Sequence, residues 1–245
     1  MRDEAGGRST AAVRRPPPRH PAWVRAAHWV NAGAFLALAV SGTAILLALP
    51  RLFWGETGAL DAPAFLVLPL PVNTEQTGWG RNVHFLAAWI FVITGSLYFA
   101  ACLLGGRLYR RLLLDADQVR PGHLGREIRD HLRLAGPQGQ GTGRGPESGE
   151  RYNALQKLAY LGVVLVLAPL MLLTGLTMSP GVTAAWPELF TLFGGRQSAR
   201  TIHFLSATAL VGFLLIHVWQ VLANGPRALM RGMILGRTGT AEGAP

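Results

Sequence analysis

His203 and His217 lie fourteen residues apart in a stretch of sequence that contains no charged side chain. In a helix of 3.6 residues per turn and about 1.5 Å rise per residue, both rings would leave the same face, roughly 21 Å apart along the axis. Neutral imidazole is a common axial ligand of haem iron. The spacing therefore predicts one ligand for each of two haems, stacked at two depths along a single helix.

The predicted helix is one of four stretches without Asp, Glu, Lys or Arg, each at least as long as the roughly 20 residues needed to cross a bilayer. Half of the chain's 245 residues are hydrophobic, only 15% are charged, and the mean hydropathy is +0.28, values that favour a membrane protein over a soluble domain. Pro169 should distort the third helix. We predict an all-α transmembrane four-helix bundle holding two stacked b haems, with helices at about 26–49, 82–104, 156–178 and 201–222.

The basic residues behind the net charge of +10 are distributed along the chain as expected for a membrane protein. Nineteen Lys and Arg residues lie in the N-terminal segment, the central connection and the C-terminal segment, and four lie in the other two loops. The positive-inside rule then places both termini in the cytoplasm of a bacterial inner membrane. No nucleic-acid partner is predicted. The membrane domain spans 25–237, between a basic and disordered tail at 1–24 and a short tail at 238–245, and includes a flexible cytoplasmic linker at 136–149.

This topology assigns a depth to each histidine in the predicted spans. His28 and His217 lie at the cytoplasmic level, whereas His84 and His203 lie at the outer level. Each level thus supplies both axial ligands of one haem. The single Cys102 excludes a Cys-x-x-Cys-His attachment site, so both haems should be b-type. The alternative is a set of structural histidines bonded to carbonyl or hydroxyl groups, although polar residues at membrane depth are more often functional.

Arginines and glycines accompany the predicted ligands. Each of three histidines follows an arginine by three residues, on the same helix face, from which a guanidinium could reach a haem propionate. Glycines on the helices would let a porphyrin approach the backbone, although glycine also favours ordinary helix packing in membranes. The candidate haem contacts are Arg25, Arg81, Arg200, Gly42, Gly95 and Gly212.

The segment Arg25-Ala-Ala-His28-Trp29-Val-Asn31, followed by Ser41-Gly42, resembles the first helix of the bacterial cytochrome b561 and nickel–iron hydrogenase b-type cytochrome superfamily. The fourth helix, with His-x13-His, is similar to that of the formate dehydrogenase gamma subunit in that superfamily. A closer resemblance, to the thiosulfate reductase cytochrome b subunit group, rests on Trp54-Gly55-Glu56, Tyr152-Asn153-x-Leu155-Gln156-Lys157-Leu158, Thr174-Gly175-x-x-Met178-Ser179-Pro180 and Met233-x-x-Gly236-Arg237.

The resemblance implies a di-haem b membrane subunit that links the quinone pool to a catalytic partner, often a molybdopterin oxidoreductase or a hydrogenase. It also implies the same pairing of histidines that depth predicts. In the formate dehydrogenase relatives the quinone lies beside the inner haem. Transferred to this chain, that position is near Arg25, Asn31, Asn153 and Asn224.

We therefore expect an electron-transfer subunit, with two haem b and an exchangeable quinone, that works with a periplasmic redox subunit through the 50–81 loop. No nucleophile–base pair or nucleotide-binding loop indicates a catalytic subunit. One alternative is a stand-alone b561-type enzyme such as a superoxide:quinone oxidoreductase, which gene neighbourhood would discriminate. A second alternative, a divalent-metal transporter, would require intramembrane carboxylates, and the four uncharged stretches contain none.

Overall fold

The computed structural model describes residues 20–56, 62–105, 154–223 and 225–236, and these form a helical bundle with one small hairpin. In chain order the elements are α1 (Ala22–Ala48), β1 (Arg51–Leu52), β2 (Leu66–Val67), α2 (Thr77–Leu104), α5 (Ala154–Leu161), η1 (Gly162–Leu167), α6 (Ala168–Thr177), α7 (Pro180–Ala185), α8 (Glu188–Leu192), α9 (Arg196–Ala223) and α10 (Pro226–Leu235).

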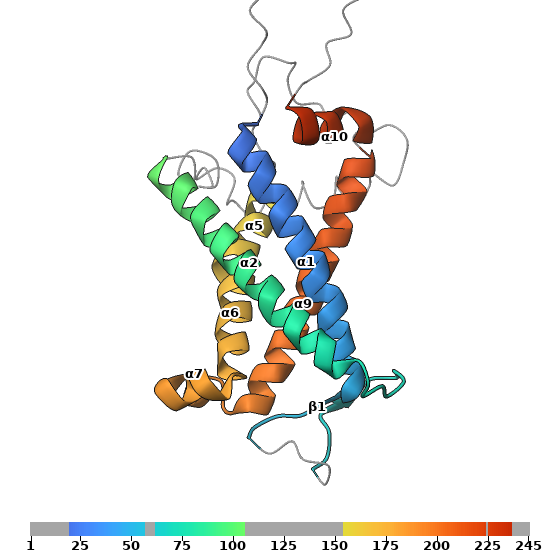
Figure 1. Cartoon of the computed structure of the whole chain (residues 1–245), viewed down its shortest axis with the longest axis vertical. Coiled ribbons are helices and arrows are strands. Elements are labelled where there is room, and N and C mark those ends of the chain that lie inside the picture. Colours follow the sequence, from blue (N-terminus) through green and yellow to red (C-terminus); the bar gives the residue numbers. More distant parts are fainter. Residues whose placement is uncertain (1–19, 57–61, 106–153, 224, 237–245) are drawn as a thin grey trace, which may run out of the picture.

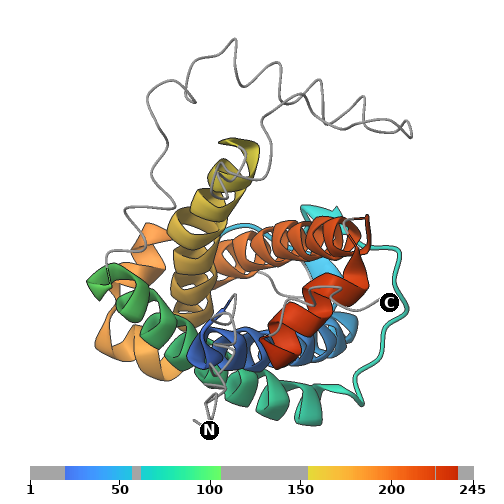
Figure 2. The ribbon, with the colours of Figure 1, turned by 90° about the horizontal axis from the view of Figure 1, so that it is seen from above.

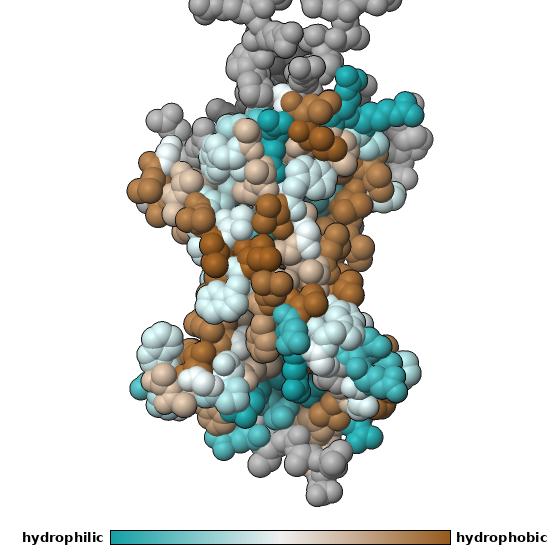
Figure 3. Space-filling model, in the orientation of Figure 1, coloured by the Kyte–Doolittle hydropathy of each residue, from teal (hydrophilic) through white to brown (hydrophobic). Residues whose placement is uncertain are grey.

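Four helices are long and apolar enough to cross a membrane: α1, α2, the continuous α5–η1–α6 helix and α9. At about 1.5 Å per residue, the 27 residues of α1 extend roughly 40 Å, more than the hydrocarbon thickness of about 30 Å. The apolar side chains lie in the middle of the molecule's surface, and hydrophilic ones gather toward its ends (Figure 3). The four membrane helices predicted from the uncharged stretches are thus confirmed.

The buried side chains are mainly small or hydroxyl-bearing. Ser41, Thr174, Thr177 and Ser198 are fully buried, whereas many large apolar side chains point outward. A membrane bundle has this distribution because lipid solvates its apolar exterior and small residues allow helices to approach closely. The interior polar groups then need hydrogen-bond partners within the protein.

The third spanning helix contains a π-helical turn, η1, just before Pro169. Proline lacks a backbone N–H and its ring collides with the preceding turn, so the α-helical hydrogen-bond pattern cannot continue unchanged. The wider turn, in which the Ala168 N–H donates to the Val163 carbonyl, accommodates the proline. The distortion expected at Pro169 therefore takes the form of a π-helical turn.

The bundle consists of two closely packed helix pairs, α1 with α2 and α6 with α9. Among the described residues, α9 makes few close backbone contacts with α1 or α2. In the view along the bundle, α9 and α6 lie on one side and α1 and α2 on the other (Figure 2). The two pairs meet mainly through side chains, and the predicted ligands are among these.

One end of the bundle carries β1, β2, α7 and α8, and we call it the hairpin end (Figure 1). Arg51 pairs with Val67, and the segment that follows β1 caps the start of α9. The Gly55 carbonyl accepts hydrogen bonds from the backbone N–H groups of Gln197 and Ser198, at 3.1 and 3.3 Å. These bonds satisfy N–H groups that a helix leaves unpaired at its start. They also fix the depth of α9 relative to α1.

The opposite end carries α10, which lies across the bundle between α1 and α9, and we call it the α10 end (Figures 1 and 2). The last carbonyls of α10 would lack partners within that helix. Trp29 Nε1 donates to the Met233 carbonyl at 3.2 Å, and Arg25 donates to the Ile234 carbonyl at 2.7 Å. The N-terminal turns of α1 therefore hold α10 in place.

Three helices, α1, α2 and α9, begin four or five residues earlier in the structure than in the prediction. The extra turns include Arg25, Arg81, Arg196 and Arg200, whose charge ends the uncharged stretches from which the spans are predicted. The predicted tails at 1–24 and 238–245 fall wholly or mostly outside the described residues. The 136–149 linker lies entirely outside them.

Gly195 should be essential for the cap on α9. Its backbone has φ +109°, and an added Cβ would lie 2.5 Å from the Gly55 carbonyl oxygen. We predict that Gly195→Ala lowers the free energy of unfolding by about 2 kcal/mol or more, measured as thermal or denaturant unfolding in detergent. Gly181→Ala, at the same end, is the control because its Cβ would meet nothing within 4 Å. Equal stability of the two variants would contradict this account.

Candidate functional site

The structure brings the four predicted histidines together as two facing pairs. His28 of α1 faces His217 of α9, and His84 of α2 faces His203 of the same helix. In both pairs the ring centres are 6.3 Å apart and the ring planes make an angle of 61°. Each pair thus joins α9 to the α1–α2 unit, one near each end of the bundle, and all four rings are partly buried.

The hairpin-end pair, His84 and His203, is held by two hydroxyl groups. Ser41 Oγ lies 3.0 Å from His84 Nδ1, and Thr174 Oγ1 lies 3.0 Å from His203 Nδ1. Both hydroxyl residues are fully buried. Because Nδ1 of each ring is engaged by its own helix pair, Nε2 is the nitrogen that is left for a group between the rings.

A glycine follows each of these hydroxyl residues and lies against the same ring. A Cβ added to Gly42 would be 3.4 Å from His84 Cε1, and one added to Gly175 would be 3.6 Å from His203 Cε1. Any side chain longer than alanine would therefore displace the imidazole. Of the other glycines predicted at the site, a Cβ added to Gly95 would lie 3.9 Å from Asn31 Oδ1, and one added to Gly212 would meet nothing within 4 Å.

The α10-end pair, His28 and His217, has aromatic neighbours instead. Trp29 contacts His28 edge-on, with ring centres 5.3 Å apart. Phe213 stacks on His217 at 6.5 Å with nearly parallel planes. Trp29 also bonds to α10, so this short helix closes the end of the bundle next to the pair.

Two of the three predicted arginines donate to a carbonyl at the end of a helix. Arg25 bonds to Ile234 at the end of α10, and Arg200 bonds at 2.5 Å to Leu49, directly after α1. A cation there is favourable because unpaired carbonyls carry the negative end of the helix dipole. Arg25 Nε is buried and has no hydrogen-bond partner among the described residues. Arg81 is exposed at the start of α2.

The predicted quinone residues are only partly described. Asn31 is one turn from His28, and its Nδ2 donates to the Ala27 carbonyl at 2.8 Å. Its Oδ1 is buried without a hydrogen-bond partner in the described part of the chain. Asn153 and Asn224 lie outside the described residues. Of the three predicted quinone residues, the described structure therefore shows the surroundings of Asn31 alone.

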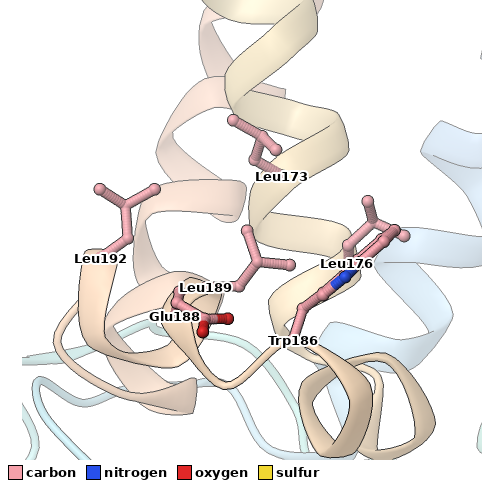
Figure 4. Close-up of a pocket in the computed structure, with 6 residues that line it drawn as sticks. All are labelled: Leu173, Leu176, Trp186, Glu188, Leu189 and Leu192. Carbon is pink, nitrogen blue, oxygen red and sulfur yellow. The ribbon is translucent and has the colours of Figure 1, made fainter.

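An apolar pocket of about 490 Å³ lies at the hairpin end, and none of the predicted site residues lines it. Its walls come from α6, from α8 and from the turn between α7 and α8 (Figure 4). Leu173 and Leu176 form one side, Trp186 forms another, and Glu188 is the charged residue of the lining. The pocket is open and contains no group that contacts either histidine pair in the described structure.

A model of the family described as prokaryotic cytochrome b561 matches residues 19–236 of this chain. The chain belongs to the prokaryotic cytochrome b561 family. A similar protein from Azospira oryzae, named putative protein-methionine-sulfoxide reductase subunit YedZ1, is 29% identical over 222 residues, covering 86% of this chain and 93% of that one. A probable Ni/Fe-hydrogenase B-type cytochrome subunit from Cupriavidus necator is 27% identical over 229 residues, covering 87% and 83% respectively.

Family membership identifies the chain as a membrane cytochrome whose prosthetic group is haem b. The superfamily inferred from the sequence is thus confirmed. The sequence motif that begins with Thr174-Gly175 does not by itself predict that these two residues lie beside the His203 ring. The shared pattern of a hydroxyl residue followed by glycine, also present at Ser41-Gly42, was the available signal.

The Trp29 hydrogen bond should hold α10 against the bundle. We predict that Trp29→Phe, which keeps the ring but removes the donor, weakens docking of α10 by about 1 kcal/mol. A spin label on Met230→Cys in a Cys102→Ser background would then become more mobile. Trp219→Phe is the matched control because Trp219 is 71% exposed on the outer face of α9. Unchanged mobility in the Trp29→Phe variant would show that this bond does not secure α10.

Proposed function

We propose that this cytochrome carries two b haems and moves electrons across the membrane between the quinone pool and a redox subunit. His28 and His217 would ligate one haem, and His84 and His203 the other. The observation that carries the proposal is the 6.3 Å separation of the ring centres in both pairs.

This separation supports an iron between the rings over a direct hydrogen bond. A five-membered ring with bonds of about 1.35 Å has its centre about 1.15 Å from each nitrogen. A metal–imidazole bond of about 2.05 Å on each side would place the centres about 6.4 Å apart. A direct hydrogen bond of about 2.9 Å between nitrogens would place them only about 5.2 Å apart.

The space between the helix pairs also suits a flat prosthetic group. Helix α9 packs on α6 rather than closely on α1 or α2, and a side chain at Gly212 would meet no neighbour within 4 Å. When bound, haem b supplies a one-electron carrier at each level. The protein's part is to hold four imidazoles, to surround them with helices that exclude water and to neutralise the propionates.

Arginines at both ends are proposed to bind those propionates. Arg25 retains a buried Nε without a partner among the described residues, and Arg200 uses only one of its five N–H groups in its bond to Leu49. Arg81 at the start of α2 would serve the same haem as Arg200. Charged hydrogen bonds of this kind are strong at the edge of a membrane.

The charge distribution supports an orientation with the α10 end in the cytoplasm and the hairpin end in the periplasm of the inner membrane. The quinone would then bind near the cytoplasmic haem, in the region of Arg25, Asn31, Asn153 and Asn224. Asn31 Oδ1, a buried acceptor without a partner in the described residues, is the structural feature that favours this region.

The partner is proposed to be a periplasmic redox subunit, of the molybdopterin type implied by the resemblance to the thiosulfate reductase and formate dehydrogenase groups. Both curated relatives are named as subunits, one of a methionine-sulfoxide reductase and one of a hydrogenase. Their names support a role as an electron-transfer subunit over that of a stand-alone oxidoreductase.

Removing one ligand from each proposed pair tests the haem assignment. We predict that His217→Ala eliminates one of two redox components in a potentiometric titration of the visible spectrum. His203→Ala should eliminate the other, because the two histidines of α9 belong to different pairs. Loss of the same component in both variants would refute the pairing, and a protein that binds no haem would refute the function.

The hairpin is the proposed docking surface for the partner. Trp54 and Phe65 are 60% and 69% exposed, and their rings lie 6.3 Å apart. Exposed aromatic residues are typical of the centre of a protein interface. We predict that Trp54→Ala/Phe65→Ala reduces co-purification of the redox subunit while leaving both haem spectra unchanged.

Trp186→Ala is the matched control for this double variant. Trp186 is 62% exposed at the same end of the bundle but lies after α7 rather than on the hairpin. It should retain the partner. Loss of the partner in Trp186→Ala, with full retention in the double variant, would place the docking surface on the 179–200 segment instead.

A further inference from the structure

We propose that Ser41 and Thr174 are positioning residues for the hairpin-end haem, and that their hydroxyl oxygens set its redox potential by accepting hydrogen bonds from the Nδ1–H groups of His84 and His203. This inference rests on the proposed di-haem function. It goes beyond that function because it names the groups that set the redox potential of one of the two haems. In the described structure, only the ligands of the hairpin-end haem are bonded to such hydroxyl groups.

The direction of each hydrogen bond follows from where the hydroxyl proton goes. Ser41 Oγ lies 2.6 Å from the Ala37 carbonyl oxygen, which can only accept, so the serine proton points there. Thr174 Oγ1 lies 2.6 Å from the Leu170 carbonyl oxygen in the same way. Each hydroxyl has no second proton and must therefore accept from the facing imidazole. Nδ1 of both rings carries the hydrogen, and Nε2 has a free lone pair.

The same arrangement occurs twice, once in each of the two helix pairs, which come from different parts of the chain. Ser41-Gly42 of α1 serves His84 of α2, and Thr174-Gly175 of α6 serves His203 of α9. In each case the hydroxyl bonds to Nδ1 and the glycine leaves room for Cε1, at 3.4 and 3.6 Å from a Cβ position. At each ring a hydroxyl oxygen lies 3.0 Å from Nδ1 and a glycine lies beside Cε1. Close packing of small residues alone would not require this arrangement at both rings.

The α10-end pair has no such arrangement in the described structure. The ring contacts of His28 and His217 there are with Trp29 and Phe213, which offer no oxygen to accept an Nδ1 proton. The two haems should therefore differ in how strongly their ligands donate charge to iron. That difference would give the two carriers separate potentials in an otherwise similar bis-histidine setting.

The sign of the effect follows from ligand basicity. An acceptor on Nδ1–H shifts electron density toward Nε2 and makes the imidazole a stronger donor. The hydroxyl is itself polarised by its bond to a carbonyl, which strengthens the effect. A stronger donor stabilises ferric iron, so the hydroxyls lower the potential of the hairpin-end haem. Their removal should raise it.

The experiment is a potentiometric titration of the purified, haem-loaded protein with Ser41→Ala, Thr174→Val and the double variant. The hairpin-end component is the one that His203→Ala abolishes. We expect its midpoint potential to rise in each single variant and further in the double variant, while the other component stays unchanged. Ser41→Thr and Thr174→Ser, which restore a hydroxyl, should return the potential toward that of the unmodified protein.

Thr177→Val is the matched control. Thr177 is also fully buried on α6, one turn from Thr174, and donates at 2.8 Å to the Leu173 carbonyl, but within the described structure its hydroxyl bonds to no histidine. Its loss should leave both potentials unchanged. If Thr177→Val shifted the midpoint potential of the hairpin-end haem as much as Thr174→Val does, the shift would be an effect of altered packing, and the inference would be overturned.

Other outcomes also decide the matter. Two haems with an unchanged hairpin-end potential in Ser41→Ala and Thr174→Val would overturn the inference and leave the di-haem function intact. If Ser41→Ala loses that haem, retention in Ser41→Thr would support the role of the hydroxyl, and loss in both would refute it. A protein without haem would instead refute the proposed function itself.

Discussion

The structure depends on how four imidazoles are accommodated inside a membrane bundle. A polar ring at membrane depth needs partners, because lipid offers none. Here the rings face each other in pairs between α9 and the α1–α2 unit, with centres 6.3 Å apart. That distance is too long for the rings to satisfy each other directly and suits one metal between them. The proposed haems would therefore link the two helix pairs.

The two ends of the bundle position these pairs by different means. At the hairpin end, the Gly55 carbonyl caps α9, and hydroxyls from α1 and α6 hold the rings. At the α10 end, a short amphipathic helix is bound through its terminal carbonyls to Arg25 and Trp29. The first arrangement fixes the orientation of the ligands, whereas the second covers one pair with a separate element. This difference agrees with distinct roles for the two proposed haems in electron transfer.

The main elements of the fold could be predicted from the sequence because they depend on local patterns. Uncharged runs give the spans, and the fourteen-residue spacing places His203 and His217 on one face. Charge asymmetry between loops then gave relative depth, and the structure has the same two pairs facing each other. Each of these inferences requires only helical geometry and hydropathy.

Contacts between distant segments could not be predicted in this way. The hydrogen bond between Thr174 and His203 and the one between Arg25 and Ile234 depend on how the helices are rotated and tilted, which side-chain packing determines. Arg25 and Arg200 illustrate the difference: their spacing predicts a role toward a propionate, but their observed bonds cap helix ends. The sequence therefore indicates which residues are important, but it does not predict all of their hydrogen-bond partners.

The haem content of the purified protein tests the central claim most directly. A pyridine haemochrome assay, combined with a protein determination and low-temperature electron paramagnetic resonance, measures both the number of haems and their coordination. Our account predicts two b haems per chain, both low-spin with two axial imidazoles. One haem per chain, or a high-spin signal from a haem with an open position in fully loaded protein, would contradict it.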